Sequence, residues 1–250
     1  MAPMLNLFAR RHTASPVGPG RVDVTRPRPA GVDTLRRALS SAEARLHDAQ
    51  VEAALTLAHA AESRDIEARG HLQAITDYGV EIAMAMGLPA IEVERYRHAS
   101  PLHDIGKIGI PDAILKKPGR LTLDEYGVMQ THASLGARLF EGASSPILQA
   151  AADICRSHHE RWDGSGYPNR LRGREIPLLA RILAVADVFD ALVTKRCYKP
   201  AWSIDDAWKE ITETTAHQFD PDVIAAFERA RPRIVRLAGL RAVPGGPQAR

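Results

Sequence analysis

The chain has 250 residues, 45% of them hydrophobic and 25% charged, which suits one globular core with flexible ends. Its net charge is +3, but residues 1–30 carry +4 and residues 231–250 carry +5, which leaves −6 for residues 31–230. The basic charge therefore belongs to the two ends of the chain. It gives little support to nucleic-acid binding, and we expect no nucleic-acid polymer as a partner.

The sequence shows no membrane or secretion signal. No apolar run approaches the roughly 20 residues that cross a bilayer, and residues 1–8 lack the charged start and hydrophobic stretch of a signal peptide. The two cysteines, Cys155 and Cys197, belong to no zinc pattern and indicate no disulfide framework. We therefore expect a cytoplasmic protein with no membrane partner.

The N-terminal part is expected to have two segments. Residues 1–32 are rich in Pro, Gly and Arg and are predicted to form a disordered basic leader. Residues 33–62 are predicted to form a helix, in which apolar residues alternate at spacings of four and three, as in a coiled-coil seam. These residues are Leu35, Leu39, Ala42, Leu46, Ala49 and Ala53. The helix either pairs two copies of the chain or packs on its own domain.

A second helix is predicted from an N-cap at Asp65 to about Met86. Glu67 and His71 lie four residues apart, so on such a helix they share one face. An isolated pair at this spacing is more often a surface contact than a metal site. The stripe predicted to be buried consists of Ile75, Ile82 and Met86.

The next helix, predicted at residues 91–102, leads into His103 and Asp104. An imidazole beside a carboxylate can hold a divalent metal, and the second carboxylate oxygen remains free to reach another ion. Ile105 and Gly106 turn the backbone, which brings Lys107 back towards the metal. A bare His-Asp pair is more often a capped helix end, so other residues must decide between the two interpretations.

Two further helices carry histidines. Thr122 and Glu125 form a predicted capping box that begins the helix with His132. The following helix begins at Ser145-Pro146 and ends at His158-His159. By itself, His132 would most often be a structural histidine, and the paired histidines are unusual without being diagnostic.

A glycine-rich loop, residues 161–168, follows and contains Gly166, Tyr167 and Pro168. Residues 176–192 then form a predicted buried helix that carries Asp187. A carboxylate in so apolar a run costs much desolvation energy unless it is paired or bound to a metal.

Beyond this helix, Arg196 and Lys199 lie in a predicted turn, and helices at 204–215 and 221–230 close the domain. Residues 231–250 are expected to form a basic tail.

Together these motifs resemble those of the HD-GYP cyclic-dinucleotide phosphodiesterases of the HD phosphohydrolase superfamily. The resemblance rests on His103-Asp104, on the run from His158 to Pro168, and on the Glu67 and His71 pair. It covers about residues 50–230, and we expect the catalytic domain at residues 63–230. The family usually has Thr and Gly where this chain has Ala68 and Arg69.

The resemblance implies an all-α fold, an HD-type helical bundle with a metal site at its centre. It implies two or three divalent metal ions, with iron or manganese favoured by a nitrogen and oxygen donor set without thiolate. The implied metal ligands are Glu67, His71, His103, Asp104, His132, His158, His159 and Asp187. Asp104 and Lys107 are implied to be catalytic, and the implied substrate-binding residues are Lys107, Gly166, Tyr167, Pro168, Arg196 and Lys199.

The implied reaction is hydrolysis of cyclic di-GMP to linear pGpG, to GMP, or to both. Two neighbouring cations suit this chemistry because they neutralise a phosphodiester and activate water at neutral pH. One alternative is an HD phosphohydrolase acting on another nucleotide or cyclic dinucleotide. A second is a non-catalytic module that binds cyclic di-GMP. The expected protein partners are a second copy through the N-terminal helix, a diguanylate cyclase, or a sensor.

Overall fold

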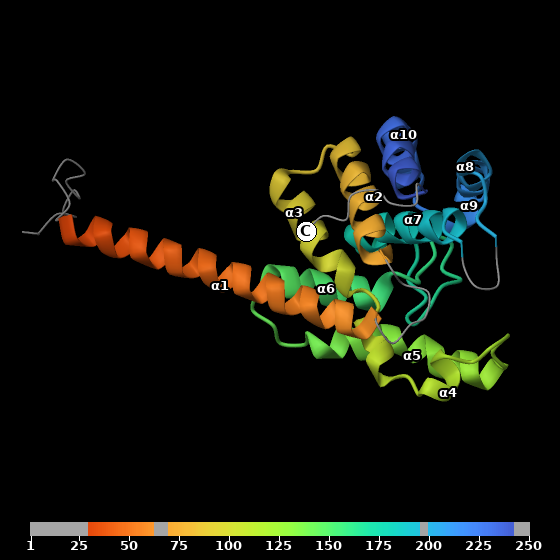
Figure 1. Cartoon of the computed structure of the whole chain (residues 1–250), viewed down its shortest axis with the longest axis horizontal. Coiled ribbons are helices and arrows are strands. Elements are labelled where there is room, and N and C mark those ends of the chain that lie inside the picture. Colours follow the sequence, from red (N-terminus) through yellow and green to blue (C-terminus); the bar gives the residue numbers. More distant parts are fainter. Residues whose placement is uncertain (1–29, 63–69, 196–199, 243–250) are drawn as a thin grey trace, which may run out of the picture. The chain divides into compact units, whose positions relative to one another are not determined.

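The computed structural model describes residues 30–62, 70–195 and 200–242, and within these ranges it contains helices and no strand, which confirms the all-α prediction (Figure 1). The longer helices are α1 Ala30–Glu62, α2 His71–Ala85, α3 Ala90–Ala99, α5 Leu123–Leu139, α6 Pro146–Ser157, α7 Leu178–Val193, α8 Ile204–Glu213 and α10 Pro221–Ala242. The short ones are α4 Asp112–Leu115, α9 Thr215–Gln218 and the 3-10 helices η1 Ser100–Leu102, η2 Ile105–Gly109 and η3 Gly173–Glu175. Among the described helices, none combines the length and apolar character that a membrane-spanning segment needs.

Helix α2 is central to the domain and packs against α3, α7 and α10. Two members of its predicted stripe, Ile75 and Ile82, are fully buried, whereas the third, Met86, is half-buried. An aromatic group completes this part of the core: Trp208 stacks on Phe227 with ring centroids 3.7 Å apart, and Phe189 meets both rings edge-on. Burial of such large rings supplies much of the favourable free energy of folding.

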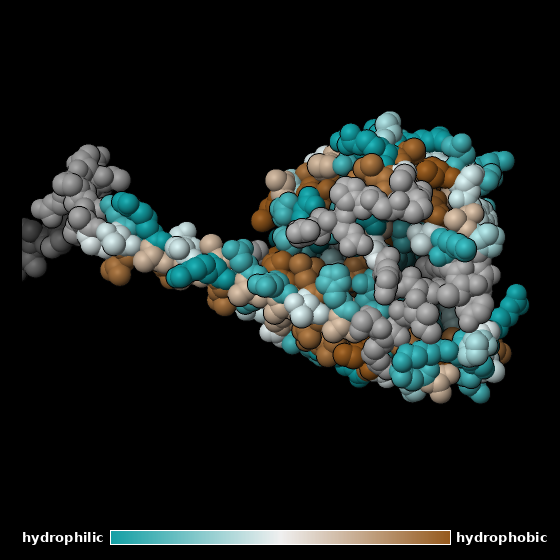
Figure 2. All heavy atoms as spheres, viewed as in Figure 1, coloured by the Kyte–Doolittle hydropathy of each residue, from teal (hydrophilic) through white to brown (hydrophobic). Residues whose placement is uncertain are grey.

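Helix α1 confirms the predicted N-terminal helix, although it begins at Ala30 and so includes residues assigned to the leader. The chain divides into two compact units, residues 1–46 and 47–250. In the second unit Ala54, Ala58 and Ala61 of α1 join the core. These three do not belong to the predicted seam, of which Leu35 is 71% exposed. Figure 2 shows polar and apolar side chains mixed along the surface of this helix, and its pairing with a second copy stays a prediction.

Several predicted helix ends are wrong, and two of them differ at a glycine or a proline. Helix α2 begins at His71 rather than near Asp65, because Gly70 has φ +81° and lies outside the right-handed helical region. Helix α3 ends at Ala99, and Pro101, which has no N–H, lies in the following η1.

The last helix was expected to end at Ala230, but α10 runs to Ala242 and tolerates Pro232 in its interior. Ile234 and Ala238 continue its buried stripe beyond the proline, and this burial outweighs the lost hydrogen bond. Residues 231–242 are therefore not a tail.

The His103-Asp104 motif reaches its place through a close approach of η2 to α5. A Cβ atom on Gly106 would overlap the backbone of His132 and Gly136 in α5. Only glycine lets the two backbones meet at this distance. The contact fixes the position of Asp104 relative to His132.

Gly106→Ala should therefore destabilise the fold by about 1–3 kcal/mol, the usual cost of overpacking a rigid core. The matched variant is Gly109→Ala in the same 3-10 helix, where the added methyl would meet only the flexible end of the Leu135 side chain. Urea denaturation of both variants measures the difference. An equal loss of unfolding free energy in the two variants would contradict the close-packing argument.

Candidate functional site

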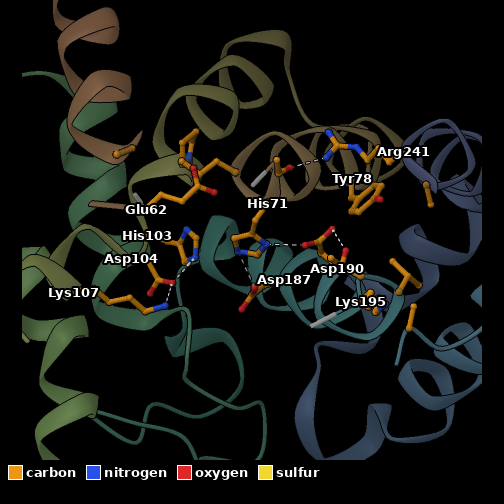
Figure 3. A pocket seen from close by; sticks show the side chains of 18 of the residues that line it. Glu62, His71, Tyr78, His103, Asp104, Lys107, Asp187, Asp190, Lys195 and Arg241 are labelled. Atoms are coloured by element: carbon orange, nitrogen blue, oxygen red, sulfur yellow. Dashed lines mark hydrogen bonds and ion pairs between the residues drawn. The ribbon is translucent and has the colours of Figure 1, made fainter. Parts of the chain in front are cut away.

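A cavity of about 790 Å³ opens beside α2 and α7, and the His-Asp motif lies on its wall. Figure 3 shows the side chains of His103, Asp104 and Lys107 on one side of this cavity, with His71 and Asp187 facing them. Farther along the wall lie Asp190, Tyr78, Lys195 and Arg241. The predicted site is therefore a concave surface that a small ligand can enter.

The first group of possible metal ligands consists of His71, His103 and Asp187, whose donor atoms lie within 4.8 Å of one another. His71 is the first residue of α2, and Asp187 lies in the middle of α7. The His71 Nε2 atom is 3.4 Å from the Asp187 Oδ1 atom. Asp187 keeps contact with the cavity, so its position in an apolar helix does not isolate its charge.

The second group consists of Asp104, His132, His158 and His159. The Oδ1 atom of Asp104 is 3.2 Å from His132 Nε2 and 3.6 Å from His158 Nε2. Its Oδ2 atom points to the other side, 3.2 Å from His103 Nε2 and 2.8 Å from Lys107 Nζ. One carboxylate therefore offers an oxygen towards each group.

Four of the imidazole rings have their Nδ1 atom hydrogen-bonded to an oxygen acceptor. Each Nδ1 therefore carries the proton, and each Nε2 keeps its lone pair for a cation. The Nδ1 bonds are His71 to Asp190 Oδ2 at 2.7 Å, His103 to Ser100 O at 3.1 Å, His132 to Met129 O at 2.6 Å, and His158 to Cys155 O at 3.0 Å.

The residues fit a divalent cation. Within the described part of the chain, His103 Nε2 and Asp104 Oδ1 are buried and accept no hydrogen bond, an arrangement that costs about 1–3 kcal/mol per group unless a ligand compensates for it. The donors are imidazole nitrogens and carboxylate oxygens. The nearby thiol of Cys155 donates to Leu102 O at 3.1 Å, and burial raises its pKa, so it stays a thiol and not a metal-binding thiolate.

The electrostatics keep three of the ligands, Asp104, His158 and His159, in their metal-binding forms. Burial alone would lower the pKa of His71, but its hydrogen bond to Asp190 and the charge of Asp187 raise it. Burial alone would raise the pKa of Asp104, but the charge of Lys107 and the contact with His103 hold this pKa well below its usual value. Burial lowers the pKa of His158 and, together with the charge of His158, lowers that of His159 well below its usual value. Asp104 is therefore ionised and both histidines are neutral near pH 7, as metal coordination requires.

The glycine-rich loop brings Tyr167 onto a member of the second group. The Tyr167 ring stacks on His159 with centroids 4.7 Å apart and planes 27° apart. Gly166 makes this possible, because a Cβ atom there would overlap the backbone of residues 159–161. The Tyr167–Pro168 peptide bond is cis. The loop therefore packs closely against His159, one of the predicted metal ligands.

The structure brings together seven of the eight predicted metal ligands, together with Lys107, in one site. Glu67, Arg196 and Lys199 lie outside the described residues. Their roles stay predictions. The described part of the helix predicted from Asp65 begins at His71, after the left-handed Gly70.

Three acidic residues at the site were not predicted. Asp190 orients His71, and buried Glu160 accepts hydrogen bonds from the backbone N–H groups of Asn169 and Leu171, which fixes the glycine-rich loop. Glu62 lines the cavity, and its Oε1 atom accepts no hydrogen bond among the described residues. The sequence does not indicate these roles, because the groups that these three residues contact belong to none of the motifs. Only Asp190 left a signal: it lies three residues after Asp187, a spacing that suggests a shared helix face.

Comparisons with known proteins agree with this geometry. A family model described as HD domain matches residues 55–223. A cyclic di-GMP phosphodiesterase of Thermotoga maritima is 46% identical over 166 residues, which are 66% of this chain and 45% of that protein. A 3′3′-cGAMP-specific phosphodiesterase of Vibrio cholerae is 41% identical over 179 residues, 72% of this chain and 34% of that protein. The chain thus spans less than half the length of these relatives.

A solved structure shows the same fold. The crystal structure of a cyclic GMP-AMP-specific phosphodiesterase from V. cholerae aligns with a TM-score of 0.56 at 21% identity and covers 75% of this chain and 50% of that one. The family model, the relatives and the convergence of the HD motif with the glycine-rich loop all lead to one assignment. The chain belongs to the HD domain family and is of the HD-GYP type that its motifs resemble.

Proposed function

We propose that this chain is a metal-dependent phosphodiesterase that hydrolyses cyclic di-GMP to linear pGpG, to GMP, or to both. The observation that carries the proposal is the meeting of two groups of metal-ligand residues at Asp104 on the wall of one cavity. The names of several relatives, including the one from T. maritima, support the same substrate. A turnover assay on anaerobically purified protein, with metal analysis, tests it.

The residues have distinct proposed roles. His71, His103 and Asp187 would hold one divalent ion, His132, His158 and His159 a second, and Asp104 would serve both. Bound cations would supply charge neutralisation and a nucleophile at neutral pH. Iron or manganese suits this donor set.

Lys107 would stabilise negative charge on the reacting phosphate or on the leaving oxygen, and its Nζ atom already lies 2.8 Å from Asp104. Because Asp104 pairs with this ammonium group, Lys107 is held at the cavity wall. The two residues together form the proposed catalytic pair.

Substrate binding would involve residues on both sides of the cavity. Arg196 and Lys199 would bind the phosphates, the arginine by a bidentate contact and the lysine as a point charge. Gly166, Tyr167 and Pro168 would form the specificity loop, a role supported by the stacking of Tyr167 on His159.

A second substrate, 3′3′-cGAMP, is favoured by one observation, the 41% identity to a phosphodiesterase named as specific for it. The two cyclic dinucleotides share their phosphates and differ in one base, so the same metal centre could act on either. Competition between them in one turnover assay decides the preference. Binding without turnover in the metal-loaded protein would instead support the non-catalytic alternative, with a diguanylate cyclase or sensor as partner.

Asp104→Asn should reduce cyclic di-GMP hydrolysis more than about 100-fold, because the shared carboxylate charge is lost. The circular dichroism spectrum should stay helical. Asp112→Asn, a change to an exposed carboxylate that pairs with Lys116 at 2.9 Å, is the matched control and should keep full activity. Near-normal turnover of Asp104→Asn with its metals retained would refute the shared-ligand role.

Arg196→Ala should weaken cyclic di-GMP binding by about 1.5–3 kcal/mol, the scale of a hydrogen bond to a charged group. Metal content should not change, since Arg196 is not a proposed ligand. The control variant is Arg174→Ala, which removes an exposed pair with Asp222. Isothermal titration of catalytically inactive Asp104→Asn protein with and without each change measures the effect, and equal affinities would remove Arg196 from the substrate site.

A third metal ion is proposed to require Glu67. Metal counting on the wild type and Glu67→Gln should give three ions and two ions per chain. Glu62→Gln is the comparison, because Glu62 lines the described cavity with a carboxylate oxygen that accepts no hydrogen bond among the described residues. If the count falls only in Glu62→Gln, then Glu62 and not Glu67 is the third-site ligand. A count of two in every protein would show that no third site exists.

A further inference from the structure

Helix α10 is joined to α2 by three arginines that we call the arginine ladder: Arg229, Arg233 and Arg241. The three lie along α10, and their partners follow α2 in the opposite direction. The contacts are Arg229 Nη2 to Ala85 O at 3.0 Å, Arg233 Nε to Glu81 Oε2 at 3.3 Å, and Arg241 Nη2 to Asp77 Oδ2 at 3.1 Å.

Arg241 makes one contact that the other two arginines do not make. Its Nη1 atom donates to the carbonyl oxygen of Gly70 at 2.7 Å. Gly70 is the N-cap of α2 and immediately precedes His71, and its carbonyl also accepts from the N–H of Ala74 at 3.1 Å. The Arg241 guanidinium thus holds the backbone at the entry to the helix that carries a metal-ligand histidine (Figure 3).

This contact matters because glycine leaves the backbone unusually free to move. Gly70 has φ +81°, and the peptide that follows it sets the direction from which His71 enters the site. The His71 ring is fixed at one point, by the bond from Nδ1 to Asp190 at 2.7 Å. The bond between Arg241 and Gly70 fixes the backbone at a second point, and two points define the orientation of the imidazole.

We propose that Arg241 is a positioning residue for His71 and sets the metal affinity of the group formed by His71, His103 and Asp187. The inference rests on the proposed function, in which this group holds a divalent ion. Arg241 lies beyond residue 223, where the match to the HD domain model ends. The C-terminal turn of α10 is thereby made part of the metal centre.

The simpler alternative is that Arg241 is an ordinary partly exposed ion pair. Its side chain is 30% exposed, and such pairs contribute little to stability. Arg233 supplies the matched control, because it also pairs with an acidic residue of α2 but contacts no backbone next to a metal ligand. An ordinary ion pair predicts similar results for both arginines.

The experiment is calorimetric titration of the metal-free full-length chain with Mn²⁺ under anaerobic conditions. Arg241→Ala should weaken one Mn²⁺ site about tenfold, the low end of the effect of removing an outer-shell partner, and leave the other site unchanged. Arg233→Ala should match the wild type at both sites. Asp77→Asn, which removes the ion pair but keeps the bond to Gly70, should also match the wild type.

Each other outcome has one meaning. Equal Mn²⁺ affinities for Arg241→Ala and Arg233→Ala would overturn the inference, as would a loss in Asp77→Asn as large as in Arg241→Ala. A wild type that binds no Mn²⁺, Fe²⁺ or other divalent ion would instead refute the proposed function. Thermal unfolding checks the fold, and Arg241→Lys replaces Arg241→Ala if that variant does not fold, because its single ammonium group lacks the fixed two-pronged donor geometry of the guanidinium. It should weaken the same site by less than Arg241→Ala does, and an unchanged site would again overturn the inference.

Discussion

The arrangement of the domain depends on holding several imidazole lone pairs and one carboxylate against each other in its interior. Such a convergence is unfavourable for the protein alone, since buried acceptors without donors cost free energy. The rings cannot turn away from it, because the oxygens that bind Nδ1 belong to helical backbone or to Asp190. The helices therefore hold these unpaired acceptors in place, and a bound cation would remove the cost in free energy.

The ligand set could be predicted from sequence because its members occur in short motifs. His103 and Asp104 are adjacent, as are His158 and His159; the first pair follows η1 and the second follows α6. Asp187 was indicated by its place in an apolar run. For these residues, local spacing and the chemistry of the side chain were enough, and the structure brings them into one site.

Contacts between distant residues could not be predicted in this way. Asp190 lies 119 residues from His71 in the chain, and nothing in either local sequence indicates their hydrogen bond. The predictions of helix ends were wrong for a related reason. The helix predicted from Asp65 ran through Gly70, whose φ of +81° lies outside the right-handed helical region. The helix expected to end at Ala230 continues to Ala242 because its buried stripe continues. Glu67 lies outside the described residues, so its role as a ligand stays a prediction that rests on the family resemblance.

The aromatic stack of Trp208 and Phe227 has a consequence for how the domain can be isolated. A fragment cut where the HD domain match ends, at residue 223, would remove almost all of α10. Trp208, Phe189 and Tyr78 would then present their rings to solvent, and a patch of that kind promotes aggregation. Expression of the HD domain on its own therefore requires a boundary after Ala242, and fusion or transplantation of the domain should join the chain there.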